Sequence, residues 1–154
     1  MLNPDFRDIL SAFLAESVEF LLVGAYALAV HGVPRATGDI DLWVRPSAEN
    51  ARRAWNALAK FGASVSRVSV DDLATAGLIY QIGVVPRRID VMTSIDGVEF
   101  HEGWLNRTEV LIEGLLVPVL GRTDLVRNKR AAGRPKDRAD LALLEESEGP
   151  TNEP

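Results

Sequence analysis

The chain has 154 residues and a formal net charge of -5; 47% of its residues are hydrophobic and none is cysteine. This length and composition predict one soluble globular domain. The missing cysteines exclude disulfides, thiolate nucleophiles and cysteine-based zinc sites, and they fit a reducing, cytoplasmic setting. The acidic balance disfavours general nucleic-acid binding. The longest apolar stretch, 20–30, is too short to cross a bilayer, so no membrane association is expected.

Helical and strand patterns alternate through the first half of the chain. Asn3 is a helix cap with Pro4 at the first helical position, and apolar residues then recur at helical spacing. Ser47 caps a later helix that Gly62 ends. The predicted elements here are a helix from Pro4, a strand over 20–23, a helix over 25–31, a loop over 33–38, a strand over 39–44 and a helix over 48–61.

The second half is predicted to hold more strands and two closing helices. Glu113-Gly114 is a hairpin signal between two apolar runs, and Thr123 is positioned to cap a helix. The predicted elements are a helical turn over 71–76, strands over 78–84 and 88–93, a short helix over 98–106, strands over 110–112 and 115–119, and helices over 123–132 and 136–146. The sequence therefore predicts a single α/β domain over 1–146 with a short mixed sheet flanked by helices, and a disordered tail over 147–154.

Two aspartates lie two residues apart in a predicted strand. Side chains alternate along a strand, so Asp39 and Asp41 point to the same face while Ile40 and Leu42 point to the core. Two neighbouring carboxylates repel one another unless a cation lies between them, and they are ligands that Mg²⁺ prefers. The alternative is a pair of solvent-facing aspartates at a strand end.

The residues around this pair favour a phosphate site. Gly24-Ala25 opens a helix, whose N-terminus offers unpaired amides and the positive end of the dipole. Arg35 and Thr37 lie in the following loop and are able to bind anions. Asp90 lies in a later strand between apolar neighbours, where it must either face a polar site or be buried at a cost in stability. Three carboxylates on neighbouring strands would suit a two-metal phosphoryl-transfer centre.

Other polar and aromatic residues admit two interpretations. Asp137 lies in the first turn of the last helix, where the dipole alone favours a carboxylate, so a structural role is as plausible as a catalytic one. Trp43 shares the face of the Asp pair, so it is either a core or groove-wall residue, the commoner role, or a residue that borders the nucleotide. His31 is expected to cap its helix. A basic cluster is either a solvated helix face or a contact for triphosphate or RNA; it comprises Lys129, Arg130, Arg134, Lys136 and Arg138.

Two sequence runs resemble a known family. Residues 22–32, Leu-Val-Gly-Ala-Tyr-Ala-Leu-Ala-Val-His-Gly, followed by Arg-Ala-Thr-Gly-Asp-Ile-Asp-Leu at 35–42, resemble the signature of the polymerase-beta-like nucleotidyltransferase superfamily. The chain is most similar to the bacterial minimal and AbiEii-type branch, which is known from toxin–antitoxin and phage-defence systems. The run over 124–141 is similar to that branch's late Lys and Asp-x-x-Asp motifs.

The resemblance implies a nucleotidyltransferase fold and a metal-dependent reaction. The enzyme would transfer a nucleoside monophosphate from an NTP to a hydroxyl and release pyrophosphate. Asp39, Asp41 and Asp90 would be the catalytic residues and the ligands of Mg²⁺ or Mn²⁺, and Asp90 would also help to activate the acceptor hydroxyl. Gly24 would let phosphate approach the backbone. With the loop residues above, the predicted nucleotide-binding set is Gly24, Ala25, Arg35, Thr37, Lys129 and Asp137.

The chain departs from the family at Ala25, where relatives have Ser or Gly. The Ala25 amide still faces phosphate, but the serine hydroxyl is missing. The alternative function is therefore a catalytically weak nucleotidyltransferase-fold protein that binds a partner, such as an antitoxin or a regulatory subunit. A purely structural domain would explain none of the three acids. An RNA end such as that of tRNA, a protein side chain and a small molecule all stay open as acceptors, and a cognate toxin or antitoxin protein is an expected partner.

Overall fold

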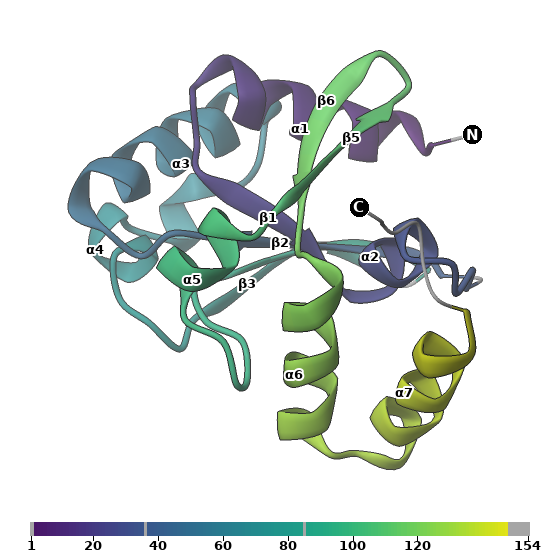
Figure 1. Ribbon diagram of the computed structural model, residues 1–154. Helices are drawn as coiled ribbons and strands as arrows, with labels where there is room; N and C mark the ends of the chain where they lie inside the picture. The colour runs from purple at the N-terminus through teal and green to yellow at the C-terminus, as the bar shows by residue number, and fades with distance from the viewer. Residues whose placement is uncertain (1, 36, 85, 148–154) are drawn as a thin grey trace.

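The strand order shows a six-stranded mixed sheet, β3-β4-β2-β1-β6-β5, in the computed structural model, which describes residues 2–35, 37–84 and 86–147. Helices α1 and α3 lie on one side of the sheet, and α5, α6 and α7 lie on the other (Figure 1). The strands are β1 (Phe20–Val23), β2 (Asp39–Val44), β3 (Ile79–Val84), β4 (Arg87–Met92), β5 (Thr108–Ile112) and β6 (Leu115–Val119). The helices are α1 (Pro4–Ala15), α2 (Gly24–Val30), α3 (Ala48–Phe61), α4 (Val70–Leu73), α5 (Phe100–Leu105), α6 (Arg122–Ala132) and α7 (Pro135–Ser147), with a 3-10 turn η1 (Val65–Arg67).

Helices α1 and α3 begin where the sequence predicts, and α3 also ends there, whereas α2 lies one residue earlier than predicted. The Asn3 side chain accepts a hydrogen bond from the Asp5 amide at 2.8 Å, and Pro4 is the first residue of α1. Ser47 caps α3, which ends at Gly62 with a φ of 100°, a left-handed conformation that costs glycine little. The buried side chains of α1, which pack against α3 and the core, are Phe6, Ile9, Leu10 and Phe13.

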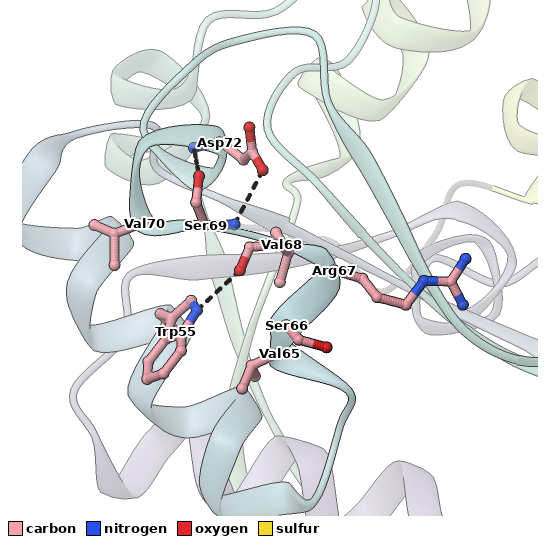
Figure 2. Close-up of a pocket in the computed structure, with 8 residues that line it drawn as sticks. All are labelled: Trp55, Val65, Ser66, Arg67, Val68, Ser69, Val70 and Asp72. Carbon is pink, nitrogen blue, oxygen red and sulfur yellow. Dashed lines mark hydrogen bonds between the residues drawn. The ribbon is translucent and has the colours of Figure 1, made fainter.

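The corner after α3 contains a hollow that is separate from the predicted site. Figure 2 shows the indole N–H of Trp55 donating to the Val68 carbonyl at 2.9 Å, and the capping box between Ser69 and Asp72 that starts α4. The hollow has a volume of about 470 Å³ and is lined by residues of α3, η1 and α4. None of the predicted site residues lines it, so we assign it no part in the chemistry.

Strand β2 lies at the centre of the sheet, antiparallel to β1 and parallel to β4. Ile40, Leu42 and Val44 are fully buried on one face, as alternation predicts. Trp43 shares the face of the Asp pair, and of its two interpretations the structure supports the core position. Its ring is 1% exposed and lies 5.0 Å from the ring of Phe100 in α5, which covers that part of the strand.

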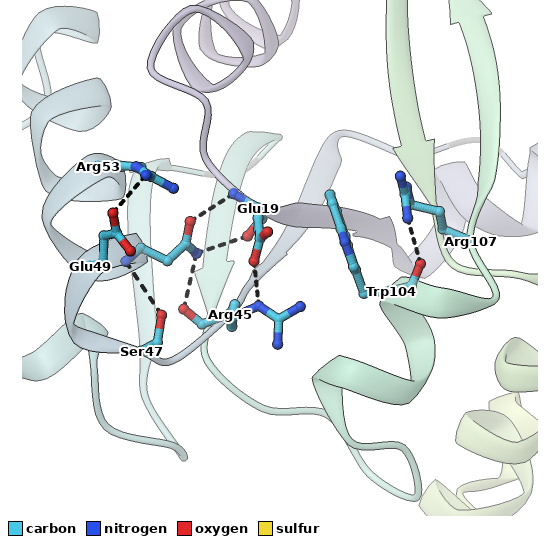
Figure 3. Close-up of polar contacts among 8 residues, drawn as sticks. Glu19, Arg45, Ser47, Glu49, Arg53, Trp104 and Arg107 are labelled. Carbon is cyan, nitrogen blue, oxygen red and sulfur yellow. Dashed lines mark hydrogen bonds and ion pairs between the residues drawn. The ribbon is translucent and has the colours of Figure 1, made fainter.

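A hydrogen-bonded junction lies at one end of β2 and a close backbone approach at the other. At its C-terminal end, the Asn50 amide group donates to the carbonyls of Glu19 and Arg45 at 2.9 and 3.0 Å and so ties β2 to the start of β1. Figure 3 shows this network beside the Arg45–Glu19 ion pair. At its N-terminal end, a Cβ on Gly38 would lie 1.3 Å from the Pro86 carbonyl oxygen, so glycine alone lets the β3–β4 turn approach β2 so closely.

The C-terminal elements differ in detail from their predictions. The hairpin at Glu113-Gly114 is confirmed, with φ of 47° and 86° at the two turn residues. The predicted Thr123 cap is wrong, because α6 begins at Arg122 with Gly121 at the N-cap and no side-chain cap. Ser147 is the last residue of α7; the rest of the predicted tail lies outside the described residues. In the described part of the chain, no helix combines the length and apolarity needed to cross a membrane.

Candidate active site

The structure brings the three predicted catalytic acids together on one face of the sheet. In the parallel β2–β4 register, Asp41 lies beside Asp90, and Asp39 lies beside Arg88. Residues paired in this way point to the same side of a sheet. All three carboxylates therefore face one cleft, from two adjacent strands whose order along the sheet the sequence does not reveal.

Arg88 is the residue of this site that sequence reasoning missed. Its Nε donates to Asp90 Oδ1 at 2.9 Å, and its Nη2 donates to Asp39 Oδ2 and Asp90 Oδ2 at 3.2 and 3.3 Å. One guanidinium thus joins a carboxylate of β2 to a carboxylate of β4. The spacing in the sequence could have identified Arg88, because a residue two positions before Asp90 in a strand must share its face.

Asp41 is the acid of this cluster whose pKa is raised most clearly. Burial raises the pKa of Asp41 to about 6, and the negative charges of Asp90 and Asp39 add to this increase. Arg88 and Lys136 oppose the shift. Ionising the Asp41 carboxylate is therefore unfavourable in the folded protein, and a cation bound beside it would reduce that cost.

Gly24 makes room for Asp41. It follows β1 with a φ of 70°, and a Cβ at this position would lie 2.0 Å from Asp41 Oδ2. The sequence predicts that Gly24 lets phosphate approach the backbone. The structure adds a second requirement, because any side chain here would displace the Asp41 carboxylate.

Two adjoining hollows form what we call the carboxylate cleft. The larger, of about 570 Å³, contains all three acids and Arg88, and extends along the start of β3 and the loop after β4. The smaller, of about 280 Å³, contains Asp39 and Asp41 but not Asp90, and it extends toward the start of α2 and the loop before β2. The residues that line both hollows are Gly24, Asp39, Asp41, Lys129, Arg134 and Lys136.

The predicted phosphate-binding residues of the first half line the smaller hollow. Gly24, Ala25, Arg35 and Thr37 are all part of its wall. Thr37 Oγ1 also accepts a hydrogen bond from the Asp39 amide at 3.1 Å, so it orients the backbone at the first acid. These four residues and the Asp pair therefore meet in one place, as the order of the motif predicts.

Lys129 faces the acids from α6 and is held by two buried carboxylates of α7. Its Nζ lies 3.3 Å from Asp137 Oδ1 and 3.2 Å from Asp140 Oδ2. Burial lowers the pKa of Lys129, and its bond with Asp137 opposes that change. Arg35 pairs with Asp140, so the same carboxylates also anchor the loop before β2.

Asp137 is not exposed to the cleft. Burial alone would raise its pKa, but bonds from Arg134 and Lys129 outweigh burial and lower the pKa of Asp137 to about 2. Its side chain is fully buried, and Arg134 Nε donates to it at 2.7 Å. Asp137 would therefore act on a nucleotide through Lys129 and Arg134 rather than by direct contact.

The basic cluster predicted near the C-terminus divides into two groups. Lys129, Arg134 and Lys136 line the carboxylate cleft. Arg130 instead lies 3.7 Å from Glu145, and Arg138 donates to the Gly133 carbonyl, so both are used on the outside of the α6–α7 pair. The cleft thus places cations of α6 and α7 opposite the acids of β2 and β4.

The donor set suits a hard divalent cation, but Arg88 competes for it. Three carboxylates in one cleft are the ligand type that Mg²⁺ or Mn²⁺ takes. Within residues 2–35, 37–84 and 86–147, no three His, Cys, Asp or Glu side chains are already grouped around one point as ligands. The cation between Asp39 and Asp90 is the guanidinium of Arg88. The chemistry of the acids fits a metal, therefore, on condition that Arg88 withdraws.

Comparison with known proteins supports one fold and one family. The family model described as "Nucleotidyltransferase of unknown function (DUF6036)" matches residues 6–146. TM1012 of Thermotoga maritima, assigned as a nucleotidyltransferase, is 18% identical with a TM-score of 0.61, over 95% of this chain and 96% of that one. A comparison with curated proteins finds no significant match.

Two further solved structures share the fold. One is the lincosamide antibiotic adenylyltransferase LnuA with lincomycin bound, 13% identical, TM-score 0.59, over 94% of this chain and 97% of that chain. The other is ANT(2")-Ia in complex with adenylyl-2"-tobramycin. It is 19% identical, with a TM-score of 0.60, over 94% of this chain and 87% of that chain. At these identities the likeness shows the fold alone, and it confirms the nucleotidyltransferase fold that the sequence predicts.

Proposed function

The chain belongs to the DUF6036 family of nucleotidyltransferases, and from this premise we propose that it transfers a nucleoside monophosphate from an NTP to a hydroxyl, with Mg²⁺ or Mn²⁺. The observation that carries the proposal is the carboxylate cleft, in which three acids face Lys129 and Lys136. An anionic triphosphate and a divalent cation together would satisfy both sets of charges.

The residues that line each hollow support an assignment of one hollow to the phosphates of the NTP and the other to the acceptor. The smaller hollow has the start of α2, Arg35, Thr37 and Lys129 around it, so we assign it the β- and γ-phosphates. Asp39 and Asp41 border both hollows, so we assign the α-phosphate to the place where the two hollows meet. Asp90 borders only the larger hollow of the two, so the acceptor hydroxyl enters from that side.

Transfer then consists of one substitution at the α-phosphorus. The acceptor oxygen forms a bond to phosphorus, the bond to the bridging oxygen breaks, and pyrophosphate leaves carrying the electron pair. Asp90 orients the hydroxyl and takes part in removal of its proton, while Lys129 stabilises the departing charge. Positioning and electrostatics supply most of the rate enhancement in such reactions.

Asp39, Asp41 and Asp90 would hold the metal. When bound, it would neutralise charge on the phosphates and lower the pKa of the acceptor hydroxyl. The raised pKa of Asp41 supports this assignment, because a cation beside that carboxylate would remove the cost of ionising it.

Two observations favour different classes of acceptor. The AbiEii-type resemblance favours an RNA end or a protein side chain, within a toxin–antitoxin pair. LnuA and ANT(2")-Ia instead favour a hydroxyl on a small molecule, since their structures hold lincomycin and adenylyl-2"-tobramycin. The larger hollow, at about 570 Å³, is in the size range of small-molecule sites.

Calorimetric titration tests nucleotide binding directly. Each NTP is titrated with and without Mg²⁺ into wild type, into the double variant Asp39→Asn with Asp41→Asn, and into Asp8→Asn, an exposed control on α1. We expect metal-dependent heat for wild type and the control only. Equal heats with and without metal, or none at all, would contradict the proposal. Tight binding of a neighbouring gene's product without NTP binding would instead support the weak-enzyme alternative.

A further inference from the structure

The guanidinium of Arg88 occupies oxygens of two of the three carboxylates proposed to hold a metal ion, Asp39 and Asp90. Nη2 of Arg88 contacts both Asp39 and Asp90, and Nε contacts Asp90 as well. A divalent cation beside these oxygens would lie within a few ångströms of the guanidinium, and two like charges at that distance repel strongly. A metal ion held by all three acids and the Arg88 bridge therefore compete for Asp39 Oδ2 and the oxygens of Asp90.

Building on the proposed function, we propose that Arg88 is an internal counter-cation. It bridges Asp39 and Asp90 when no metal is bound, and it opposes binding of metal alone. It transfers to a nucleotide phosphate when metal and NTP enter together. A metal ion that binds without nucleotide displaces the Arg88 guanidinium, which then has no anion to bind. Metal with nucleotide supplies phosphate oxygens, which the planar fork of arginine binds well. The exchange makes metal binding depend on the presence of substrate.

The position of Arg88 suits such an exchange. It lines the larger hollow, and its side chain is 26% exposed, so it is not locked in the core. Among the described residues, its hydrogen bonds to Asp39 and Asp90 use Nε and Nη2, which leaves the Nη1 donors for a ligand. Lys129 and Arg134 differ from Arg88 in their partner, because both bind Asp137, which is buried away from the cleft.

The test measures Mn²⁺ binding, without nucleotide, by the electron paramagnetic resonance signal of free Mn²⁺. The variants are Arg88→Gln and Arg88→Lys; the matched control is Arg87→Gln, which removes the neighbouring, exposed arginine of β4. We expect Arg88→Gln to bind Mn²⁺ about tenfold more tightly than wild type, as removal of one nearby like charge predicts. Arg87→Gln should match wild type.

Two further measurements separate displacement from simple loss of structure. In EDTA, Arg88→Gln should melt at a lower temperature than Arg87→Gln, because Asp39 and Asp90 lose the cation that they share. A non-hydrolysable NTP analogue should lower the Mn²⁺ dissociation constant of wild type strongly and that of Arg88→Gln much less. If circular dichroism shows that Arg88→Gln does not fold, Arg88→Lys is used in its place. The lysine ammonium is a point charge and cannot span both carboxylates, so we expect Arg88→Lys to bind Mn²⁺ with an affinity between those of wild type and a variant without the charge.

The outcomes distinguish failure of this inference from failure of the proposed function. Equal or weaker Mn²⁺ binding by the folded Arg88 variants, with wild type binding Mn²⁺ and the analogue together, overturns the counter-cation role alone. Absence of Mn²⁺ binding in every variant, even with the analogue, overturns the metal-dependent function and this inference with it.

Discussion

Replacing Asp41 by Asn should stabilise the metal-free protein at neutral pH. The pKa of Asp41 is raised from 3.8 to about 6, first by burial and then by the charges of Asp90 and Asp39. At 1.36 kcal/mol per pKa unit, ionising Asp41 in the folded protein costs about 3 kcal/mol. A neutral amide of the same shape avoids this cost, so most of that free energy should be recovered.

The sign of the effect fixes its pH dependence. A carboxyl whose pKa is higher in the folded state contributes stability that is fully present below its unfolded value, near pH 3.8, and that is lost as the pH rises through about 6. The advantage of Asp41→Asn should therefore be absent near pH 4 and complete by pH 7.5. For a chain of this size, about 3 kcal/mol corresponds to a melting temperature roughly 6–12 °C higher.

Urea and thermal unfolding in EDTA measure this difference at pH 4 and pH 7.5. Asp8→Asn is the matched control, because it makes the same change on an exposed turn of α1 and should change stability little at either pH. Mn²⁺ with an NTP analogue should stabilise wild type and not Asp41→Asn. An Asp41→Asn protein that is less stable than wild type at pH 7.5, or equally shifted at both pH values, would refute the electrostatic reasoning.

Three further predictions concern the cleft. Gly24→Ala should destabilise the fold by more than about 1 kcal/mol in urea unfolding and abolish NTP binding, because φ is 70° and the new Cβ overlaps Asp41 Oδ2. An unchanged unfolding midpoint would mean that the loop adapts. Ala25→Ser should tighten NTP binding by about 1.5–3 kcal/mol in calorimetry, the value of a hydrogen bond to a charged group, and no gain would mean that position 25 does not face phosphate. Asp90→Asn should retain most NTP affinity while kcat falls by orders of magnitude; equal losses in binding and turnover would place Asp90 in ground-state binding instead.

The sequence predicts the local parts of the fold well because their causes are local. Asn3, Ser47 and Gly62 fix the helix ends by their own side-chain or backbone chemistry, and the structure confirms each of them. The hairpin at Glu113-Gly114 is confirmed for the same reason. Thr123 is the exception, because α6 starts one residue earlier and leaves it inside the first turn.

The parts that the sequence could not reveal depend on tertiary contacts. Alternation predicts that Asp39 and Asp41 share a face, but only the β2–β4 register shows that Arg88 lies between Asp39 and Asp90. Trp43 shares that face too, and periodicity does not reveal that α5 covers it. Which carboxylates of α7 are buried against Lys129 likewise depends on how α6 and α7 pack.

Transfer of an α-phosphate label tests the central claim most directly. Wild type is incubated with Mn²⁺, a small-molecule or RNA acceptor pool, and each NTP labelled either at the α- or at the γ-phosphate. Nucleotidyl transfer predicts that α-label, but not γ-label, becomes attached to an acceptor, and that the Asp39→Asn and Asp41→Asn double variant transfers neither. Attachment of γ-label, or equal transfer of α-label by the double variant, would contradict a nucleotidyltransferase that works through these carboxylates.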